Sequence, residues 1–290
     1  MHPQRLSAWR TSRADVSGSV IGALMLALAL GGCSDGTADP APPPASLPAQ
    51  PTRSTANDAE AVKIRELAEA GEEVSVETSD GVRLEGLAFG SGSSALVLSH
   101  MGRTGDNLED WLVAATELAK PARTVLVYNR RGVCSRILDL CSDGFDTLDE
   151  SWRDVVAADR FVRERGSDRV VLAGASIGAM ATFHAASGHA VNPDGLIWFG
   201  GVLDGEYTFT EAIARRLPPV PILYLSAVDD TYGGGRAARR MHEWTRSRSR
   251  LALVPGREHG TDLIEVGADH PRRERVMTEV DRLWRRIEQQ

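Results

Sequence analysis

The sequence predicts an α/β domain in which a mostly parallel sheet is covered by helices on both faces. From about residue 73 to the C-terminal end, short apolar segments alternate with segments of helical pattern, an order typical of parallel sheets. Most of the apolar segments are continuous, as strands buried on both faces are. One of them, residues 170–173, runs into a glycine-flanked turn and then into a helix of small residues. These observations favour one α/β core of about 230 residues.

The predicted elements follow one another in a regular order. Residues 73–89 are expected to form a hairpin, because Ser79-Asp80-Gly81 is a turn sequence between two strand patterns. Thr147 and Glu150 have the spacing of a capping box, which would begin a helix. Strands are predicted at residues 95–99, 124–128, 170–173, 195–199, 221–227 and 251–256. Helices are predicted at residues 107–120, 147–164, 179–186, 211–217, 235–244 and 272–287.

The turn Gly174-Ala175-Ser176-Ile177-Gly178 is predicted to carry a nucleophile. A Gly-x-Ser-x-Gly turn between a strand and a helix strains the serine backbone and raises its hydroxyl above the sheet edge. Glycine is needed at both positions because a Cβ there would collide with the neighbouring strand and helix. The pentapeptide alone is not specific in a chain with 28 glycines, so its weight depends on partner residues further along the chain.

An acid and a histidine come after the serine in the chain, each just past a predicted strand. Asp229 and Asp230 come directly after one strand, and His259 comes after the next. A serine hydroxyl needs an imidazole to take its proton, and the imidazole needs a carboxylate to fix its tautomer. The order Ser, acid, His therefore indicates a catalytic triad. His270, which precedes Pro271 in a polar segment, is the weaker alternative to His259 because no strand leads to it.

These motifs together resemble the α/β-hydrolase family, of the dienelactone-hydrolase-like or serine-esterase type, over about residues 73–290. The resemblance implies an α/β-hydrolase fold with an N-terminal β-hairpin. Many hydrolases of this fold insert a lid after the strand that corresponds to the predicted strand ending at Phe199 in this sequence. Only about 20 residues lie between Phe199 and Pro221, which implies little or no lid. The resemblance is carried by Ser99-His100-Met101-Gly102, Asn129-Arg130-Arg131-Gly132, Gly174–Gly178, Asp229-Asp230 and His259-Gly260.

The resemblance also implies roles for the triad. Ser176 would be the nucleophile and His259 the base and acid that moves its proton. The strand register of the family places the orienting carboxylate at Asp230 and leaves Asp229 as the alternative. Tyr232 and Met180 are candidates for the wall of the substrate pocket.

The oxyanion hole implied by the resemblance consists of backbone donors. It would use the N–H of Ile177 together with that of Met101 or Gly102. Met101 stands where the family usually has glycine. The turn Asn129-Arg130-Arg131-Gly132 resembles a family Asp-x-Arg-Gly turn and is interpreted as structural, with Arg131 bracing loops.

The N-terminal segment predicts export. Residues 1–32 place arginines before a charge-free apolar run, the pattern of a signal peptide. Leu30-Gly31-Gly32-Cys33 resembles the lipobox of bacterial lipoproteins, which implies a diacylglyceryl thioether on Cys33 with fatty acyl chains such as palmitate. Ordinary secretion is the alternative. Residues 33–60 are rich in Pro, Ala, Ser and Thr and predict a disordered tether, and residues 61–290 form the predicted hydrolase domain.

The cysteine count fits an oxidising compartment. The chain has three cysteines, and lipidation of Cys33 leaves Cys134 and Cys141 in one loop. A disulfide between them would stabilise the fold by very roughly 2–3 kcal/mol through loop closure. Two free thiols are the alternative.

Charge and composition restrict the function. The chain has 33 basic and 40 acidic residues, and removing residues 1–32 leaves 30 and 39, a net charge near −9, which argues against nucleic acid as a partner. No metal-ligand spacing and no cofactor motif is visible. The predicted function is cleavage of an ester, or of a thioester or amide, in a small acyl substrate, outside the cytoplasm and anchored to a bacterial membrane. An acyltransferase with the same triad, or a lipid-tethered binding protein with an idle site, is the alternative.

Overall fold

The computed structural model describes residues 54–99, 102, 105–265 and 267–289, with side chains from residue 58 onward. These residues belong to one compact unit, Pro51–Gln290. The predicted signal peptide, the lipidation site Cys33 and the tether up to residue 53 lie outside the described residues, as does Met101. Within the described part of the chain, the helices are all too short or too polar to span a bilayer.

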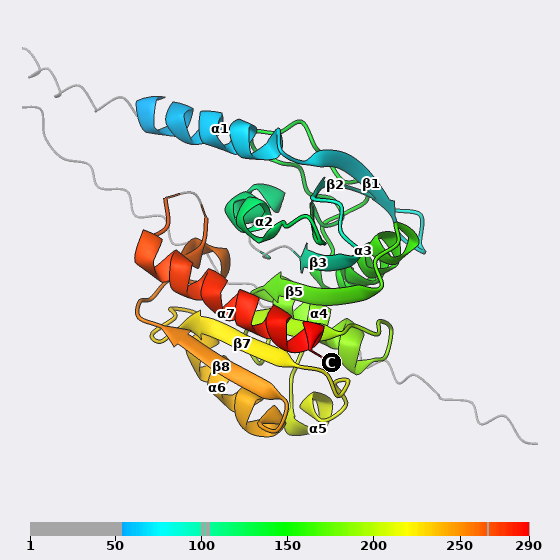
Figure 1. The fold of residues 1–290 in the computed structure, drawn as a ribbon, viewed down its shortest axis with the longest axis vertical. Helices are drawn as coiled ribbons and strands as arrows, with labels where there is room; N and C mark the ends of the chain where they lie inside the picture. The colour runs from blue at the N-terminus through cyan, green and yellow to red at the C-terminus, as the bar shows by residue number, and fades with distance from the viewer. Residues whose placement is uncertain (1–53, 100–101, 103–104, 266, 290) are drawn as a thin grey trace, which may run out of the picture. The chain divides into compact units, whose positions relative to one another are not determined.

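The sheet has eight strands in the order β1-β2-β4-β3-β5-β6-β7-β8. β1 pairs antiparallel with β2, and β2 pairs antiparallel with β4, whereas the strands from β4 to β8 are parallel. The predicted mostly parallel sheet with an N-terminal hairpin is therefore confirmed (Figure 1). The strands are β1 (Glu72–Glu77), β2 (Arg83–Phe89), β3 (Ser94–Ser99), β4 (Arg123–Tyr128), β5 (Arg169–Ala175), β6 (Gly195–Phe199), β7 (Ile222–Ala227) and β8 (Ser249–Val254).

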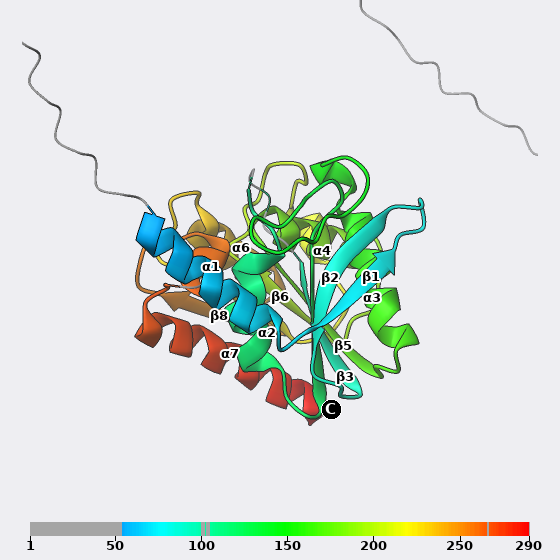
Figure 2. The same cartoon turned by 90° about the horizontal axis from the view of Figure 1, so that it is seen from above.

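Helices cover both faces of this sheet (Figure 2). Helices α1, α2 and α7 pack on one face, and α3, α4, α5 and α6 pack on the other. Side chains along β3 alternate between the two layers: Leu96 and Leu98 face the first, and Ala95 and Val97 face the second. The α-helices are α1 (Ser54–Ala68), α2 (Leu112–Leu118), α3 (Trp152–Glu164), α4 (Ile177–Ser187), α5 (Glu211–Ala214), α6 (Gly234–Thr245) and α7 (His270–Glu288), and the 3₁₀ turns are η1 (Leu108–Trp111), η2 (Leu148–Glu150) and η3 (Gly260–Leu263).

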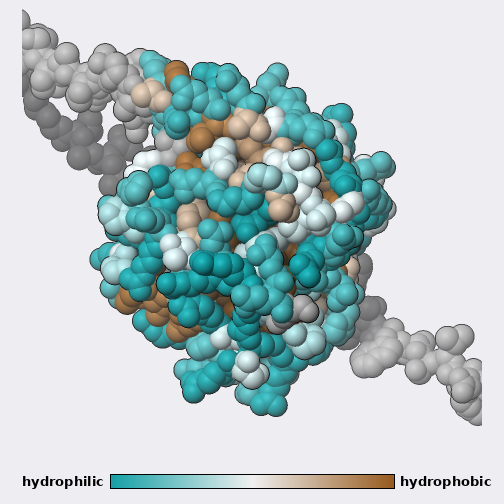
Figure 3. Space-filling view, viewed as in Figure 1, coloured by the Kyte–Doolittle hydropathy of each residue, from teal (hydrophilic) through white to brown (hydrophobic). Residues whose placement is uncertain are grey.

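The outer surface of the first layer is polar. The face seen in Figure 3, over α7 and its neighbours, shows mainly hydrophilic side chains with apolar ones scattered among them. α7 has its apolar residues, such as Val276, Val280 and Leu283, buried in the core. An amphipathic helix of this kind closes the core on one side and faces water on the other.

Helix α1 is an element that the sequence pattern did not predict. It begins at Ser54, so the expected boundary of the tether at residue 60 falls inside a helix. The last proline before it is Pro51, and the sequence after it is rich in Ala, Glu, Lys and Arg, which favour helix. Ile64 is buried in the core, and Leu67 and Ala68 pack against it. Tertiary packing therefore orders a segment whose own pattern is weak.

The capping box predicted at Thr147 does not form. Thr147 makes no side-chain cap hydrogen bond to a backbone N–H. Its hydroxyl lies 3.2 Å from the carbonyl oxygen of Phe145 and 3.5 Å from a carboxylate oxygen of Glu150. Glu150 accepts a hydrogen bond from Arg131 at 3.2 Å. The predicted helix consequently begins as the 3₁₀ turn η2 and becomes α-helical only at Trp152.

The segment between β6 and β7 is short and contains little regular structure. Its helix α5 covers only Glu211–Ala214 rather than the predicted residues 211–217. Pro218 and Pro219 come shortly after it, and proline disfavours helical conformation in the residue before it. No large insertion covers the carboxyl edge of the sheet in this segment, as the sequence predicted.

Arg131 joins loops that lie far apart in the chain, as predicted. Its guanidinium is almost fully buried and hydrogen-bonds to Asp154 of α3 at 2.9 Å. It also binds Asp80 in the β1–β2 turn at 2.9 Å. A buried cation needs such partners, because leaving it unpaired would destabilise the fold strongly. The side chain of Arg131 thus connects the hairpin turn with η2 and α3.

Candidate active site

Ser176 occupies the turn between β5 and α4. Its backbone has φ 52° and ψ −119°, in the region of positive φ that non-glycine residues rarely adopt. Its N–H donates to the carbonyl of Phe199 at the end of β6, at 2.9 Å. Such strain persists only where the surroundings enforce it, and it is common at functional positions. The sharp turn predicted from Gly174–Gly178 is therefore present.

Gly174 allows the helix to approach the strand. A Cβ at this position would lie 2.2 Å from the carbonyl oxygen of Gly178 and 2.3 Å from its carbonyl carbon. These are backbone atoms of α4, so they cannot move aside as a flexible side chain could. Glycine at position 174 is therefore a packing requirement of the turn.

The structure brings three predicted side chains into one hydrogen-bonded row. Nε2 of His259 lies 2.8 Å from Oγ of Ser176. Nδ1 of His259 lies 2.9 Å from Oδ2 of Asp230 and 3.0 Å from Oδ1. His259 and Asp230 are 3% and 7% exposed. Because a carboxylate only accepts, Nδ1 carries the proton and Nε2 is free to accept the serine O–H.

Hydrogen bonds keep Asp230 ionised. Burial by itself would raise the pKa of this carboxyl, but the hydrogen bond from His259 and those from the backbone of Tyr232 and Gly234 lower the pKa below its ordinary value. The N–H of Tyr232 is 2.8 Å from Oδ1, and the hydroxyl of Ser226 is 3.1 Å from Oδ2. A charged Asp230 is therefore available to stabilise a positive imidazolium.

The two alternatives that the sequence left open do not contact the row. Asp229 is exposed, and its N–H donates to the carbonyl of Gly256. His270 is exposed as the first residue of α7 rather than part of a polar loop. Pro271 suits the first turn of this helix because the proline lacks an N–H that would be unpaired there.

The predicted oxyanion donors are described in part. Ile177 is the first residue of α4, directly after Ser176. Gly102 lies against it, since a Cβ on Gly102 would come within 2.5–2.8 Å of the Ile177 side chain. Met101 lies outside the described residues. The role of these backbone N–H groups therefore stays a prediction.

Of the two side chains considered for the pocket wall, only Tyr232 lies at the site. Its ring centroid is 4.5 Å from that of His259, and the residue is 56% exposed. Met180 is fully buried in the core of the second layer. The ring of Tyr232 thus lies exposed beside His259.

Two carboxyl groups with raised pKa values, one in η1 and one just after η3, were not predicted. Burial, reinforced by Asp262 and Asp110, raises the pKa of Glu265 to about 7. Burial likewise raises the pKa of Asp110 to about 6, against the opposing charge of Arg136. Glu265 comes shortly after His259, whereas Asp110 belongs to η1. Their proximity depends on the fold and has no signal in the local sequence.

Cys134 and Cys141 form the predicted disulfide, with a Cα–Cα distance of 4.0 Å. Among the side chains that the structure describes, no group of three or more His, Cys, Asp or Glu residues is arranged to hold a metal ion.

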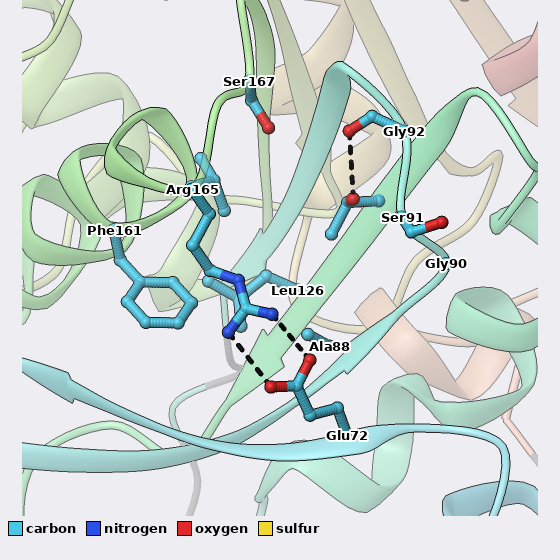
Figure 4. A pocket seen from close by; sticks show the side chains of 11 residues that line it. Glu72, Ala88, Gly90, Ser91, Gly92, Leu126, Phe161, Arg165 and Ser167 are labelled. Carbon is cyan, nitrogen blue, oxygen red and sulfur yellow. Dashed lines mark hydrogen bonds and ion pairs between the residues drawn. The ribbon is translucent and has the colours of Figure 1, made fainter.

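A separate cavity of about 160 Å³ lies away from the triad (Figure 4). It is lined by residues at the amino ends of the parallel strands, including Gly92, Thr124 and Ser167. Arg165 and Glu72 form an ion pair across it at 2.6 Å. Ser176 lies just past the carboxyl end of β5, so this cavity belongs to the opposite edge of the sheet.

The raised pKa of Glu265 predicts how stability changes with pH. The folded pKa, about 7, lies above the ordinary 4.5, so folding binds this proton more tightly. The stabilisation is complete below the ordinary pKa and is lost as the pH rises through the folded one. Glu265→Gln should therefore lose less thermal stability between pH 5 and pH 8 than the wild type, measured by differential scanning calorimetry. Glu274→Gln, on the exposed side of α7, is the control, and equal slopes for wild type and Glu265→Gln would contradict the prediction.

Comparisons with known proteins show what the chain is similar to. No protein-family model and no curated protein matches it. An esterase of Pyrococcus furiosus, Pf2001, aligns with a TM-score of 0.59 at 16% identity, covering 77% of this chain and 92% of that one. A Xanthomonas campestris protein described as an α/β serine hydrolase without lid aligns with a TM-score of 0.57 at 20% identity, covering 74% and 94%. An α/β serine hydrolase homologue from Coxiella burnetii aligns with a TM-score of 0.56 at 19% identity, covering 73% of this chain and 96% of that one. With the strand order above, these likenesses show that the chain has the α/β-hydrolase fold.

Proposed function

We propose that the protein is a serine hydrolase that cleaves carboxylic esters, or related thioesters or amides, by way of an acyl-enzyme. The observation that carries this proposal is the row Ser176–His259–Asp230, with hydrogen-bond distances of 2.8 Å and 2.9 Å. The row begins at a strained turn and ends at a buried carboxylate. Nucleophile, base and orienting acid thus stand in the geometry that acyl transfer requires.

In the proposed reaction, all three groups take part in acylation of the serine and again in deacylation. Ser176 Oγ attacks the carbonyl carbon while its proton passes to Nε2 of His259. Asp230 stabilises the imidazolium that results. His259 then gives the proton to the leaving alcohol, and the acyl group stays on Ser176. Water, deprotonated by His259, releases the acid and restores the serine.

Backbone donors at the start of α4 are proposed to stabilise the tetrahedral intermediate. The N–H of Ile177 is adjacent to the nucleophile, and Gly102 lies against the same residue. We assign the second donor to Gly102 or, as the sequence also allowed, to Met101. Each such donor typically contributes a few kcal/mol to the transition state.

An ester substrate is preferred over a peptide. The β6–β7 segment adds only the short helix α5, and the exposed ring of Tyr232 flanks the histidine, so the site offers an open, partly apolar surface to a small acyl group. The likeness to the Pyrococcus furiosus protein described as an esterase, and to the Xanthomonas campestris protein described as lacking a lid, supports this preference.

The first test of this proposal is covalent labelling. A fluorescent fluorophosphonate should label the wild-type protein at Ser176 and leave Ser176→Ala unlabelled. The same substitution should lower kcat for p-nitrophenyl acetate by at least about 10³-fold. Absence of labelling in the wild type, or equal labelling of Ser176→Ala, would sink the proposal.

Replacing each acid in turn tests the assignment of the carboxylate. Asp230→Asn keeps the shape but no longer holds the tautomer of His259, so kcat should fall about 10³- to 10⁴-fold. Asp229→Asn alters an exposed side chain, and its kcat should stay within about twofold of the wild type. The assignment to Asp230 is wrong if the two variants behave in the reverse way.

We also propose that the protein is exported and anchored to a bacterial membrane through a lipid on Cys33. The motif around Cys33 and the polar, proline-rich segment after it support this. Cys33→Ala should shift the protein from the membrane fraction to the soluble extracytoplasmic fraction, as measured by immunoblotting. Continued retention in the membrane would count against lipidation.

A further inference from the structure

Glu109 in η1 is a buried carboxylate that the proposed chemistry does not use. Its side chain is 0% exposed. Oε1 accepts the backbone N–H groups of Ile137 and Leu138 at 2.7 Å and 2.9 Å, and Oε2 accepts from Arg136 at 3.3 Å. A carboxylate is costly to bury unless several donors satisfy it. All three donors come from the loop that the Cys134–Cys141 disulfide closes, so this charge ties η1 to that loop.

The loop is itself held in one shape and joined to η1 a second time. Within it, the N–H of Ser135 donates to the carbonyl of Leu140 at 2.9 Å. Asn129 donates from its amide to the same carbonyl at 2.9 Å. The amide oxygen of Asn129 accepts the N–H of Leu108, the first residue of η1, at 2.9 Å. Several hydrogen bonds therefore join η1 to the loop and to Asn129 beside it.

η1 in turn touches the groups that place the nucleophile. Its last residue, Trp111, donates from Nε1 to the carbonyl of Ser99 at the end of β3, at 3.0 Å. The ring of Trp111 meets the ring of Phe199 edge-on, with centroids 5.7 Å apart. The carbonyl of Phe199 accepts the N–H of Ser176 at 2.9 Å. A continuous series of contacts thus runs from Glu109 to the backbone of the nucleophile.

We propose that Glu109 is a positioning residue for the reaction. It fixes η1 against the disulfide-closed loop, and through Trp111 and Phe199 it sets the place of Ser176 relative to His259. The proposal rests on the serine-hydrolase function proposed above. Loss of this support should leave substrate binding largely intact but misplace the attacking oxygen. A displacement near 1 Å in a catalytic group can cost on the order of 10²-fold in rate, so a partial loss should cost about tenfold.

Two substitutions at Glu109 separate a positioning role from bulk packing. Glu109→Gln retains an oxygen that can accept the N–H groups of Ile137 and Leu138, and its kcat should stay within about threefold of the wild type. Glu109→Ala removes that oxygen, and its kcat for p-nitrophenyl acetate should fall about tenfold with KM within about twofold. The rate of fluorophosphonate labelling should fall in parallel with kcat.

Glu279→Ala is the matched control. Glu279 of α7 is also a buried carboxylate, and it is paired with Arg250 of β8 and Arg282 of α7. Its loss should lower the unfolding temperature without lowering kcat. An equal fall of kcat in Glu279→Ala and Glu109→Ala would show that any buried carboxylate has this effect, and would overturn the positioning role.

Removing the disulfide tests the positioning role in another way if Glu109→Ala does not fold. Full-length wild-type protein reduced with dithiothreitol, and the double variant Cys134→Ser/Cys141→Ser, should each lose about tenfold in kcat with KM little changed. The inference is overturned if both keep kcat within twofold of the oxidised protein while that protein is labelled normally. Failure of the oxidised wild type to react with the fluorophosphonate is a different result, because it contradicts the proposed function itself.

Discussion

The hydrogen bond from the hydroxyl of Ser176 to Nε2 of His259, at 2.8 Å, is the contact on which the proposed chemistry depends. The two residues are 83 positions apart in the chain and come after different strands. Parallel pairing from β5 through β8 aligns the carboxyl ends of those strands at one edge. The positive φ of Ser176 then turns its side chain toward that edge, which glycine at position 174 makes sterically possible.

The carboxyl groups of Asp230 and Glu265 differ in pKa because their surroundings differ. Asp230 accepts from an imidazole, a hydroxyl and backbone donors, so it stays ionised although buried. The pKa of Glu265 is set mainly by burial and by the neighbouring charges of Asp262 and Asp110, which raise it to about 7. Within one region of the fold, the number and charge of the partners decide which acid is charged at neutral pH.

The loops above the carboxyl edge are held mainly by polar contacts. Arg131 joins the hairpin turn to α3, and Glu109 joins η1 to the disulfide loop. Loops have too few apolar side chains to form a core of their own, so buried ion pairs and a covalent link take that place. The same contacts bring η1 close to the residues that support the nucleophile. Structural stability and the geometry of the site are thus coupled in this region.

A short run of neighbouring residues encodes each of the strands, the hairpin, the turn at Ser176 and the position of His259, so these features could be predicted from the sequence. The choice between Asp229 and Asp230 depended on the fold, since two adjacent aspartates differ only in where the chain directs them after β7. The tertiary structure also formed α1, whose pattern is weak without the core around Ile64, and it left Thr147 uncapped, with Glu150 bound to Arg131. Glu109 is 28 and 29 residues from the amide groups it binds. No local pattern contains such a contact, because the folded chain alone brings its partners together.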